Sequence, residues 1–273
     1  MKNIIKKLLY ILLLSTIFYA CKDANVTPAT SGLVKIAEAV TTGSSFKVAM
    51  YANDSAFVGY NKVYIQLTDI STGKSISQAG LVFHPLMDMG TTQHACPSEN
   101  PTGLTNTNGL FEGAVLFSMG GVNMWSVSVD VTANNKTETV KLAIPKVNAL
   151  NPVQKIVVID SVMNNGVLTQ TKYPLSIVKT SDWKVGMNKF EITIHLQQDM
   201  MTFPANNDFS VQITPEMPSM GHGSPNNVNP VNMGNGHYVG SVNFTMTGMW
   251  RIHLLIQKNN RVVSNYSYFD IIF

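Results

Sequence analysis

Several features that are common in proteins are scarce in this sequence. Its 273 residues include only two cysteines, and charged residues make up 13% of the total. No run of Lys and Arg with interleaved aromatic residues occurs, which argues against nucleic-acid binding. Beyond the N-terminal region, no apolar segment is long enough to span a bilayer. We therefore expect a folded region that neither binds nucleic acid nor crosses a membrane.

Motifs that mark catalysis are also missing. Neither a Ser-His-Asp constellation, nor a paired-carboxylate motif, nor a glycine-rich phosphate loop occurs in a recognisable setting. Helical periodicity is absent too, since no stretch after the N-terminal region holds an apolar repeat of about 3.6 residues. The sequence therefore predicts a protein that is not an enzyme.

The N-terminal region has the features of an export signal. Lys2, Lys6 and Lys7 form a positive segment, and residues 8–18 form an apolar stretch that is short for a membrane span. We predict a signal peptide over residues 1–20. These residues hold three of the 19 Lys and Arg and none of the 16 Asp and Glu, so the remainder carries 16 basic and 16 acidic residues. The mature chain is therefore expected to have balanced charge.

A cysteine stands at the expected cleavage point. Ala20 precedes Cys21, and a cysteine in this position resembles that of a bacterial lipoprotein signal, in which the thiol carries lipid. We therefore predict lipidation at Cys21, a tether over residues 21–31, and anchoring in the bacterial envelope, in the outer membrane or facing the periplasm. Ordinary secretion is the alternative. In the anchored protein, Cys96 has no partner for an intramolecular disulfide.

The folded region contains an internal repeat. Residues 58–63 (VGYNKV) match residues 185–190 (VGMNKF), and residues 109–113 (GLFEG) match residues 236–240 (GHYVG), at the same offset of 127. A period this long indicates two duplicated domains, because solenoid repeats run about 20–50 residues.

Alternating apolar and polar residues predict half-buried β-strands in both copies. The alternation is clear over residues 46–50, 63–67, 125–131, 192–196 and 250–254. Clusters of Gly, Asn, Asp and Ser separate these segments, and short strands with frequent turns favour an antiparallel immunoglobulin-like sandwich. The sequence therefore predicts an all-β fold with two tandem sandwiches after a cleaved signal peptide.

Turn signals and prolines divide the folded region. Asn165-Gly166 and Asn259-Asn260 suit tight hairpin turns, which need positive φ. The segment from Pro145 to Pro152 separates two strand-rich blocks. We therefore predict a first domain over residues 32–147 and a second over residues 152–273.

The matched blocks continue into strands that share one pattern. Alternate residues on one strand are apolar, a glycine on that face leaves room for a large ring, and a Trp begins the next strand. We therefore predict that Met119, Trp125, Met246 and Trp250 lie in the cores. The alternating positions are Phe111, Gly113, Val115, Phe117 and Met119 in the first copy and Tyr238, Gly240, Val242, Phe244 and Met246 in the second.

Each copy also carries a polar segment that contains Met and His. Thioethers are soft ligands and imidazole accepts Cu(I) or Cu(II), so these residues suit copper in an oxidising compartment outside the cytosol. Met-rich turns also cap the open ends of sandwiches, where unbranched side chains fill gaps, and this alternative stays open. The candidate copper ligands are Met217, Met220, His222, Met233 and His237 in the second copy and Met87, Met89 and His94 in the first.

Together these motifs resemble the YtkA-like domain, whose relatives occur in FixH-like proteins and beside CopC-like copper proteins. The pattern begins with Val-Gly-x-Asn, passes through the Met/His segment, and ends with Gly-x-Phe/Tyr-x-Gly and Met-Trp. It spans residues 58–131 and 185–256, although residues 91–93 separate Gly90 from His94 in the first copy. The resemblance implies an immunoglobulin-like sandwich of the bacterial envelope that is associated with copper handling. The ligands it implies are Met217, Met220, His222, Met87, Met89 and His94.

Two functions from different classes follow from the sequence. The first is lipid-anchored binding or delivery of copper, with a copper-donating or copper-receiving protein as partner. The second is protein or glycan binding by a tandem β-sandwich lipoprotein without a metal. Aromatic residues that could stack on a sugar are almost missing from the Met/His segments, which favours the first function.

Overall fold

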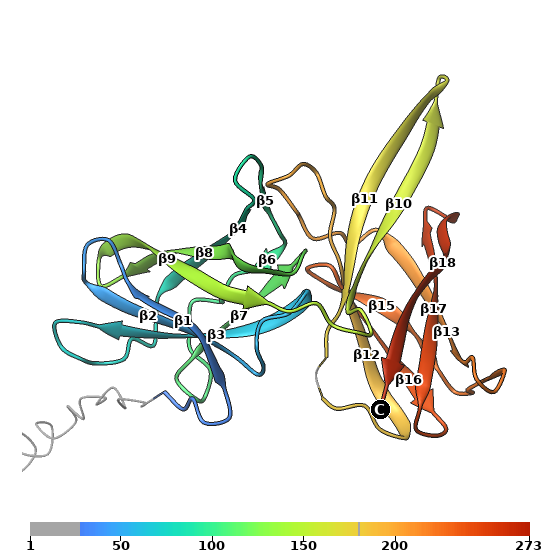
Figure 1. The fold of residues 1–273 in the computed structure, drawn as a ribbon, viewed down its shortest axis with the longest axis horizontal. Coiled ribbons are helices and arrows are strands. Elements are labelled where there is room, and N and C mark those ends of the chain that lie inside the picture. The colour runs from blue at the N-terminus through green and yellow to red at the C-terminus, as the bar shows by residue number, and fades with distance from the viewer. Residues whose placement is uncertain (1–27, 180) are drawn as a thin grey trace, which may run out of the picture.

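The computed structural model describes residues 28–179 and 181–273. The predicted signal peptide, the predicted lipidation at Cys21 and most of the predicted tether lie outside the described residues. Within the described part, every regular element is a β-strand, and no helix is long and apolar enough to cross a membrane. The strands form two antiparallel sandwiches that follow one another along the chain (Figure 1). The predicted all-β tandem fold is confirmed.

The first sandwich packs a five-stranded sheet on a four-stranded sheet. The strand order is β1-β2-β3-β7-β6 in the larger sheet and β5-β4-β8-β9 in the smaller one. The larger sheet consists of Val34–Val40 (β1), Phe46–Ala52 (β2), Gly59–Asp69 (β3), Phe111–Phe117 (β7) and Ser98–Glu99 (β6). The smaller sheet consists of Gln93–Ala95 (β5), Gly80–Asp88 (β4), Gly121–Ala133 (β8) and Lys136–Val147 (β9).

The second sandwich repeats this topology strand for strand. Its sheets have the orders β10-β11-β12-β16-β15 and β14-β13-β17-β18. The larger sheet consists of Lys155–Asn164 (β10), Val167–Ile177 (β11), Gly186–Ile194 (β12), His237–Phe244 (β16) and Val228–Gly234 (β15). The smaller sheet consists of His222–Gly223 (β14), Phe209–Met217 (β13), Met249–Lys258 (β17) and Arg261–Ile272 (β18).

Strand pairing follows the sequence repeat residue by residue. Gly59 on β3 pairs with Phe117 on β7, and Gly186 on β12 pairs with Phe244 on β16. Both partners are therefore shifted by the offset of 127 that relates the two copies in the sequence. The matched blocks occupy equivalent places in two copies of one fold.

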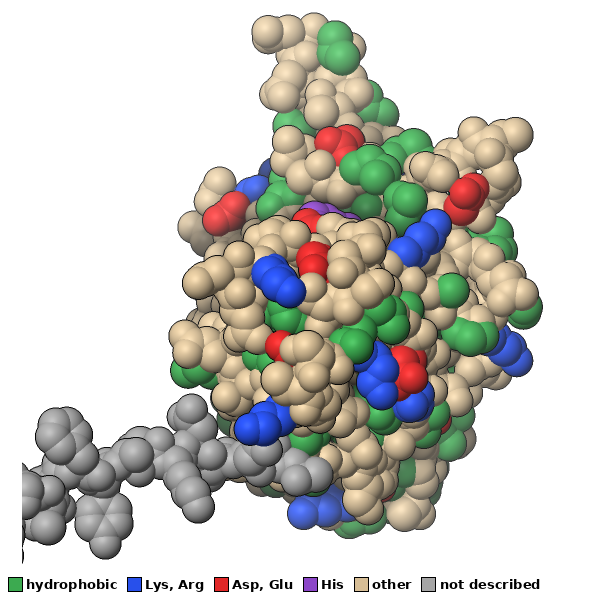
Figure 2. Space-filling model, turned by 90° about the vertical axis from the view of Figure 1, so that its left-hand side faces the viewer, with side chains coloured by type: hydrophobic (Ala, Val, Ile, Leu, Met, Phe, Trp, Pro, Cys, Tyr) green, Lys and Arg blue, Asp and Glu red, His purple; other side chains and the backbone are tan. Residues whose placement is uncertain are grey.

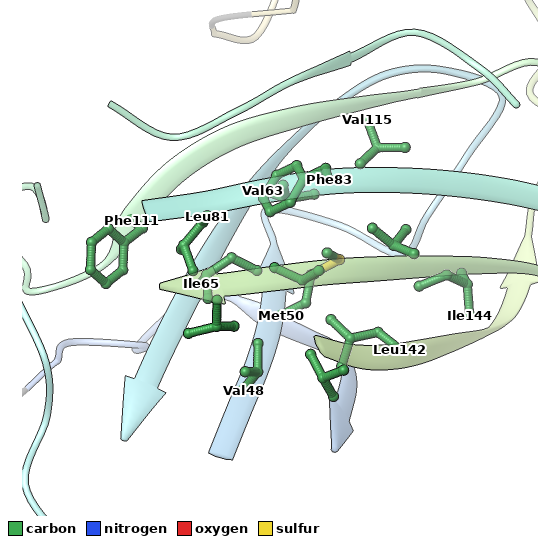
Figure 3. Packing of buried hydrophobic residues seen from close by; sticks show 14 of the residues in the cluster. Val48, Met50, Val63, Ile65, Leu81, Phe83, Phe111, Val115, Leu142 and Ile144 are labelled. Carbon is green, nitrogen blue, oxygen red and sulfur yellow. The ribbon is translucent and has the colours of Figure 1, made fainter. Parts of the chain in front are cut away.

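Each sandwich has its own hydrophobic core between its two sheets. In the first core, Val48 and Ile65 from the larger sheet meet Phe83 and Leu142 from the smaller one (Figure 3). The second core is built in the same way, with Phe190 and Tyr238 from one sheet and Ile252 and Phe269 from the other among its members. Alternation places these side chains inward because successive residues of a strand point to opposite faces.

A buried asparagine explains the repeated Val-Gly-x-Asn block. The side-chain amide of Asn61 donates to the carbonyls of Phe57 and Gly59, and its oxygen accepts the N–H of Phe57. Asn188 does the same with Lys184 and Gly186. Each asparagine therefore satisfies backbone groups of the turn that leads into β3 or β12, and the block is a structural device.

Two core predictions are wrong. Met119 is 46% exposed and Met246 is 37% exposed, whereas Trp125 and Trp250 are buried as predicted. The strands β7 and β16 end at Phe117 and Phe244, so the alternation stops before either methionine is reached. At Gly113 a Cβ would lie 2.6 Å from the carbonyl oxygen of Glu99 on β6 and 2.7 Å from the ring of Phe83, so glycine makes room there for the strand as well as for the expected ring. At Gly240 a Cβ would likewise meet the backbone of the neighbouring strand, β15.

The hairpin of β10 and β11 extends away from the body of the second sandwich (Figure 1). Its turn residues Asn165 and Gly166 have φ of 49° and 79°, which confirms the predicted tight turn. Met163, Val167 and Leu168 near its tip are each more than half exposed. On the face shown in Figure 2, the top of this hairpin carries no charged side chain.

Candidate metal site

In the second sandwich, the Met/His segment forms the turn that joins β13 to β14. Met217 ends β13 and pairs with His222, the first residue of β14. The N–H groups of Met220 and Gly221 both donate to the carbonyl of Met217 at 3.0 Å. Gly221 has a φ of 64°, the left-handed conformation that glycine adopts without strain. The turn therefore brings the predicted ligands Met217, Met220 and His222 together.

The ring of a buried tryptophan packs against the histidine of this turn. The rings of His222 and Trp250 meet edge to face, with centroids 5.8 Å apart and planes at 84°. Trp250 is itself held in place, because its Nε1–H donates to the carbonyl of Met246 at 3.0 Å. The imidazole of His222 therefore packs against a buried indole whose position is fixed by a hydrogen bond, at the open end of the sandwich.

The first sandwich builds the same arrangement from its own residues. Met87 on β4 pairs with His94 on β5 and with Trp125 on β8. The rings of His94 and Trp125 meet with centroids 5.5 Å apart and planes at 84°, and Trp125 Nε1–H donates to the carbonyl of Met119 at 2.9 Å. We call Met87, His94 and Trp125 the first Met–His–Trp group, and Met217, His222 and Trp250 the second.

The candidate methionines differ in exposure. Met87 and Met217 are 0% and 3% exposed and belong to the hydrophobic cores. Met89 and Met220, which follow them in the turns, are 39% and 60% exposed. Each turn therefore offers one accessible thioether, that of Met89 or Met220, while the methionine of each Met–His–Trp group is buried.

The ring nitrogens of His94 have different environments. Nδ1 lies 3.0 Å from the carbonyl oxygen of Ala95, and because a carbonyl only accepts, Nδ1 carries the hydrogen and donates it. Nε2 is buried and has no hydrogen-bond partner among the described residues. The lone pair of a neutral imidazole therefore lies on Nε2, in the form that binds a metal ion.

Met233 and His237 do not complete the second group. Phe244, at the end of β16, packs on Trp250 with ring centroids 5.4 Å apart. His237 begins the same strand seven residues earlier, which places it roughly 23 Å away at a strand rise of about 3.3 Å per residue. Met233 lies beside His237 at that opposite end, since its neighbour Gly234 pairs with His237.

His237 joins the two sandwiches instead. Its Nδ1 lies 2.6 Å from Glu191 in the second sandwich, and its Nε2 lies 2.9 Å from Glu99 in the first. The hydroxyl of Tyr60 also donates to Glu99, at 2.9 Å. Sequence reasoning missed this contact because Glu99 and His237 are separated by 138 residues and belong to no shared motif.

Charge and burial set the protonation of this junction. Hydrogen bonds to Glu191 and Glu99 raise the pKa of His237 to about 9, so its ring is positively charged at neutral pH. Burial opposes ionisation of Glu191, but its contacts with His237 and Lys189 outweigh burial and lower its pKa. Burial lowers the pKa of nearby His195 to about 4, so that ring is neutral. Glu99, His195 and His237 border a cleft of about 660 Å³ between the sandwiches.

Oxygen, nitrogen and thiolate ligands alone do not form a metal centre here. Among the described residues, no group of three or more His, Cys, Asp or Glu could hold a metal ion. Cys96 is buried in the first core, and burial raises the pKa of its thiol well above the usual range. A site in this part of the chain would therefore depend on methionine sulfur together with histidine.

Comparison with known proteins identifies part of the second sandwich. Residues 168–254 match the family model described as YtkA-like, a range that includes the second Met–His–Trp group. The YtkA-like character predicted from the sequence is confirmed for this range. No curated protein matches the chain.

Two solved structures align with the chain at low similarity. The Escherichia coli adhesin FdeC aligns with 15% identity and a TM-score of 0.27, over 86% of this chain and 66% of the adhesin chain. Invasin, a bacterial integrin-binding protein, aligns with 12% identity and a TM-score of 0.23, over 84% of this chain and 39% of the invasin chain. The chain thus spans less than two thirds of either protein, and these superpositions carry no conclusion about its function.

Proposed function

We propose that the protein binds Cu(I) at the open end of each sandwich, through the histidine of each Met–His–Trp group and the exposed methionine of the adjoining turn, Met89 or Met220. The observation that carries the proposal is repetition. In both sandwiches a methionine pairs with a histidine whose ring stands edge-on to a buried tryptophan, at centroid distances of 5.5 and 5.8 Å. The two turns differ in sequence and length, yet this arrangement is the same.

The chemistry of these side chains suits a soft monovalent cation. Thioether sulfur favours Cu(I), and neutral imidazole binds it as well. His94 and His222, with the exposed sulfurs of Met89 and Met220, would hold the ion. The free Nε2 of His94 supports the fit, since a buried ring nitrogen without a partner is otherwise costly.

We further propose that the protein acts in the bacterial envelope, anchored by lipid at Cys21, and exchanges copper with a partner protein. The support is the N-terminal sequence, with its positive segment, its short apolar stretch and a cysteine at the expected cleavage point. In this proposal the protein binds copper and does not act as an enzyme. Changing Cys21 to Ser should abolish membrane partitioning, and a variant that still partitions would contradict the anchor.

The copper proposal can be tested with a matched pair of methionine variants. Purified protein is titrated anaerobically with Cu(I) in competition with a chromophoric Cu(I) chelator, and zinc serves as the control metal. Met220→Leu and His222→Ala should each weaken one site by about tenfold or more, because even outer groups of a metal site contribute this much. Met233→Leu changes a similarly exposed methionine at the opposite end of the same sandwich and should leave binding unchanged. Absence of Cu(I) binding by the unmodified protein would refute the proposal.

A second candidate function is adhesion to another macromolecule through the β10–β11 hairpin. The exposed Met163, Val167 and Leu168 near its tip favour it, because residues 161–171 carry no charge to keep this surface in water. Replacing the three side chains by Ser should then abolish attachment of the protein to a cell surface or matrix while leaving its thermal stability unchanged. Equal attachment of the variant would exclude this function for the hairpin.

A further inference from the structure

The first Met–His–Trp group touches the second sandwich. The N–H of Ala95, which follows His94 on β5, donates to the carbonyl oxygen of Met200 at 2.8 Å. Met200 belongs to the loop between β12 and β13, so a segment of the second sandwich lies along the free edge of β5. Figure 1 shows this loop reaching toward β5 across the gap between the two bodies.

The contacting loop has a fixed shape. Oδ1 of Asp199 accepts the N–H groups of Met201 and Thr202, both at 2.7 Å. The N–H of Gln198 donates to the carbonyl of Thr202 at 3.1 Å, which closes the loop at its base. An aspartate that caps its own turn in this way holds the following residues in place. The loop therefore presents Met200 and Met201 from a defined position.

The two methionines of this loop are accessible. Met200 is 47% exposed and Met201 is 56% exposed, so neither side chain fills a core. The equivalent loop of the first sandwich, residues 70–79, contains no methionine. Exposed thioethers beside β5 are therefore a particular feature of the second sandwich, and they stand next to the strand that carries His94.

We propose that Met200, with Met201, supplies thioether sulfur across the domain junction to the same ion that His94 and Met89 hold. This inference rests on the proposed copper function and extends it. The first site is then shared by both sandwiches, and copper binding there fixes how they are placed relative to each other. The second site differs, because no backbone hydrogen bond among the described residues joins the turn of residues 217–222 to the first sandwich.

Three features of the structure support a shared site. One is the direct hydrogen bond between Ala95 and Met200, which brings the loop to the residue beside His94. Another is the unpartnered Nε2 of His94, which needs a ligand or a donor. The last is ligand number, since His94 and Met89 alone provide one nitrogen and one accessible sulfur, and soft Cu(I) sites gain affinity from added thioethers.

The test isolates the first site by working in a His222→Ala background, in which the second site is weakened. Cu(I) affinity is measured anaerobically by chelator competition before and after the added double change Met200→Leu and Met201→Leu. The control is the double change Met163→Leu and Met187→Leu in the same background, which replaces two exposed methionines elsewhere in the second sandwich. Leucine keeps the volume and removes only the sulfur, so folding should be preserved in both cases.

We expect the loop variant to lose about tenfold or more of the remaining Cu(I) affinity and the control to lose none. A second readout is hydrogen exchange at the Ala95 amide, which Cu(I) should slow in the His222→Ala protein but not in the loop variant. If the loop variant binds Cu(I) as tightly as its background, the shared site is wrong while the proposed function stands. If the unmodified protein binds no Cu(I), both proposals fail together.

Discussion

The two sandwiches share a strand order and a register, and they differ at their ends. Both hold a buried asparagine near the start of the third strand and a tryptophan whose N–H is bonded to a methionine carbonyl. The second sandwich has the long β10–β11 hairpin and the Met200 loop, whereas the first has a short β1–β2 hairpin and a loop without methionine. The Met/His turn of the first sandwich is hydrogen-bonded to the second sandwich, whereas among residues 28–179 and 181–273 no backbone hydrogen bond joins the turn of the second sandwich to the first.

This comparison separates structural repetition from functional repetition. The blocks that are most alike in sequence, residues 58–63 and 185–190, turn out to satisfy backbone groups of a turn. The Met/His turns are less alike, since six residues separate Met87 from His94 and four separate Met217 from His222. Their geometry on the tryptophan is nevertheless the same, with ring planes at 84° in both. Common geometry built from different turns is what a common ligand would require.

The largest expected effect comes from removing either tryptophan. Trp125→Ala and Trp250→Ala should each cost about 3–5 kcal/mol of unfolding free energy, because each ring is buried in one core. Since the cores are separate, we expect each variant to lower the transition of its own sandwich only, as measured by denaturant unfolding of the full chain. A single transition that shifts equally in both variants would contradict separate folding on either side of residues 145–152.

The next largest effect is a difference in unfolding free energy between two methionine variants of the second sandwich. Met217→Ala should cost about 2–5 kcal/mol, because the side chain is 3% exposed and its loss leaves a cavity. Met246→Ala should cost less than about 1 kcal/mol, because its side chain is 37% exposed and only its carbonyl holds Trp250. Thermal unfolding of the two variants checks this difference. Equal destabilisation would mean that Met246 packs more tightly than its exposure indicates.

The asparagine pair gives a smaller and matched effect. Asn61→Ala and Asn188→Ala should each cost about 1–3 kcal/mol, because each leaves buried backbone groups of a turn without partners. The two values should agree closely, since the hydrogen bonds are equivalent. Denaturant midpoints for the two sandwiches provide the measurement, and a large difference between the variants would contradict the structural equivalence of the two asparagines.

The smallest effect concerns the junction and depends on pH. The folded pKa of His237, about 9, lies above the ordinary value of about 6.5. Its charge therefore supports the junction fully below about pH 6.5, and this contribution is lost as the pH rises through about 9. The pKa of Glu191 is lowered in the folded protein. Its contribution to the stability of the junction is therefore lost at acid pH, as the pH falls through this folded pKa.

Small-angle scattering can follow this change. We expect the radius of gyration to increase between about pH 7 and about pH 10 in the unmodified protein, as the contact between His237 and Glu99 weakens. His237→Gln, which cannot become charged, should show the looser form at both values. A radius that does not respond to pH in the unmodified protein would mean that other contacts hold the junction.

The fold could be predicted from the sequence because its signals are local. Alternation predicts the strands, Asn165-Gly166 predicts the β10–β11 turn, and the offset of 127 predicts the matching registers. The errors at Met119 and Met246 arise where the alternating pattern was extended beyond Phe117 and Phe244, the last residues of their strands. Periodicity shows which face a strand buries, but it does not show where the strand ends.

The candidate site could be predicted only in part. Met217, Met220 and His222 fall in one turn, so their proximity follows from the chain itself. The contribution proposed for Met200 rests on its contact with Ala95, which lies 105 residues earlier and on another sandwich. The hydrogen bond at His237 Nε2 depends in the same way on Glu99, which belongs to the first sandwich. Contacts between domains leave no periodic trace in a sequence, so only the folded structure shows them.

The most direct measurement of the central claim is tryptophan emission during an anaerobic Cu(I) titration of the purified protein. Because His94 and His222 stand on Trp125 and Trp250, copper at both groups should change the emission until two equivalents are bound per chain. Trp125→Phe and Trp250→Phe should each remove one step and leave the other. Emission that stays constant while copper binds, or an identical response to zinc, would contradict copper binding at the Met–His–Trp groups.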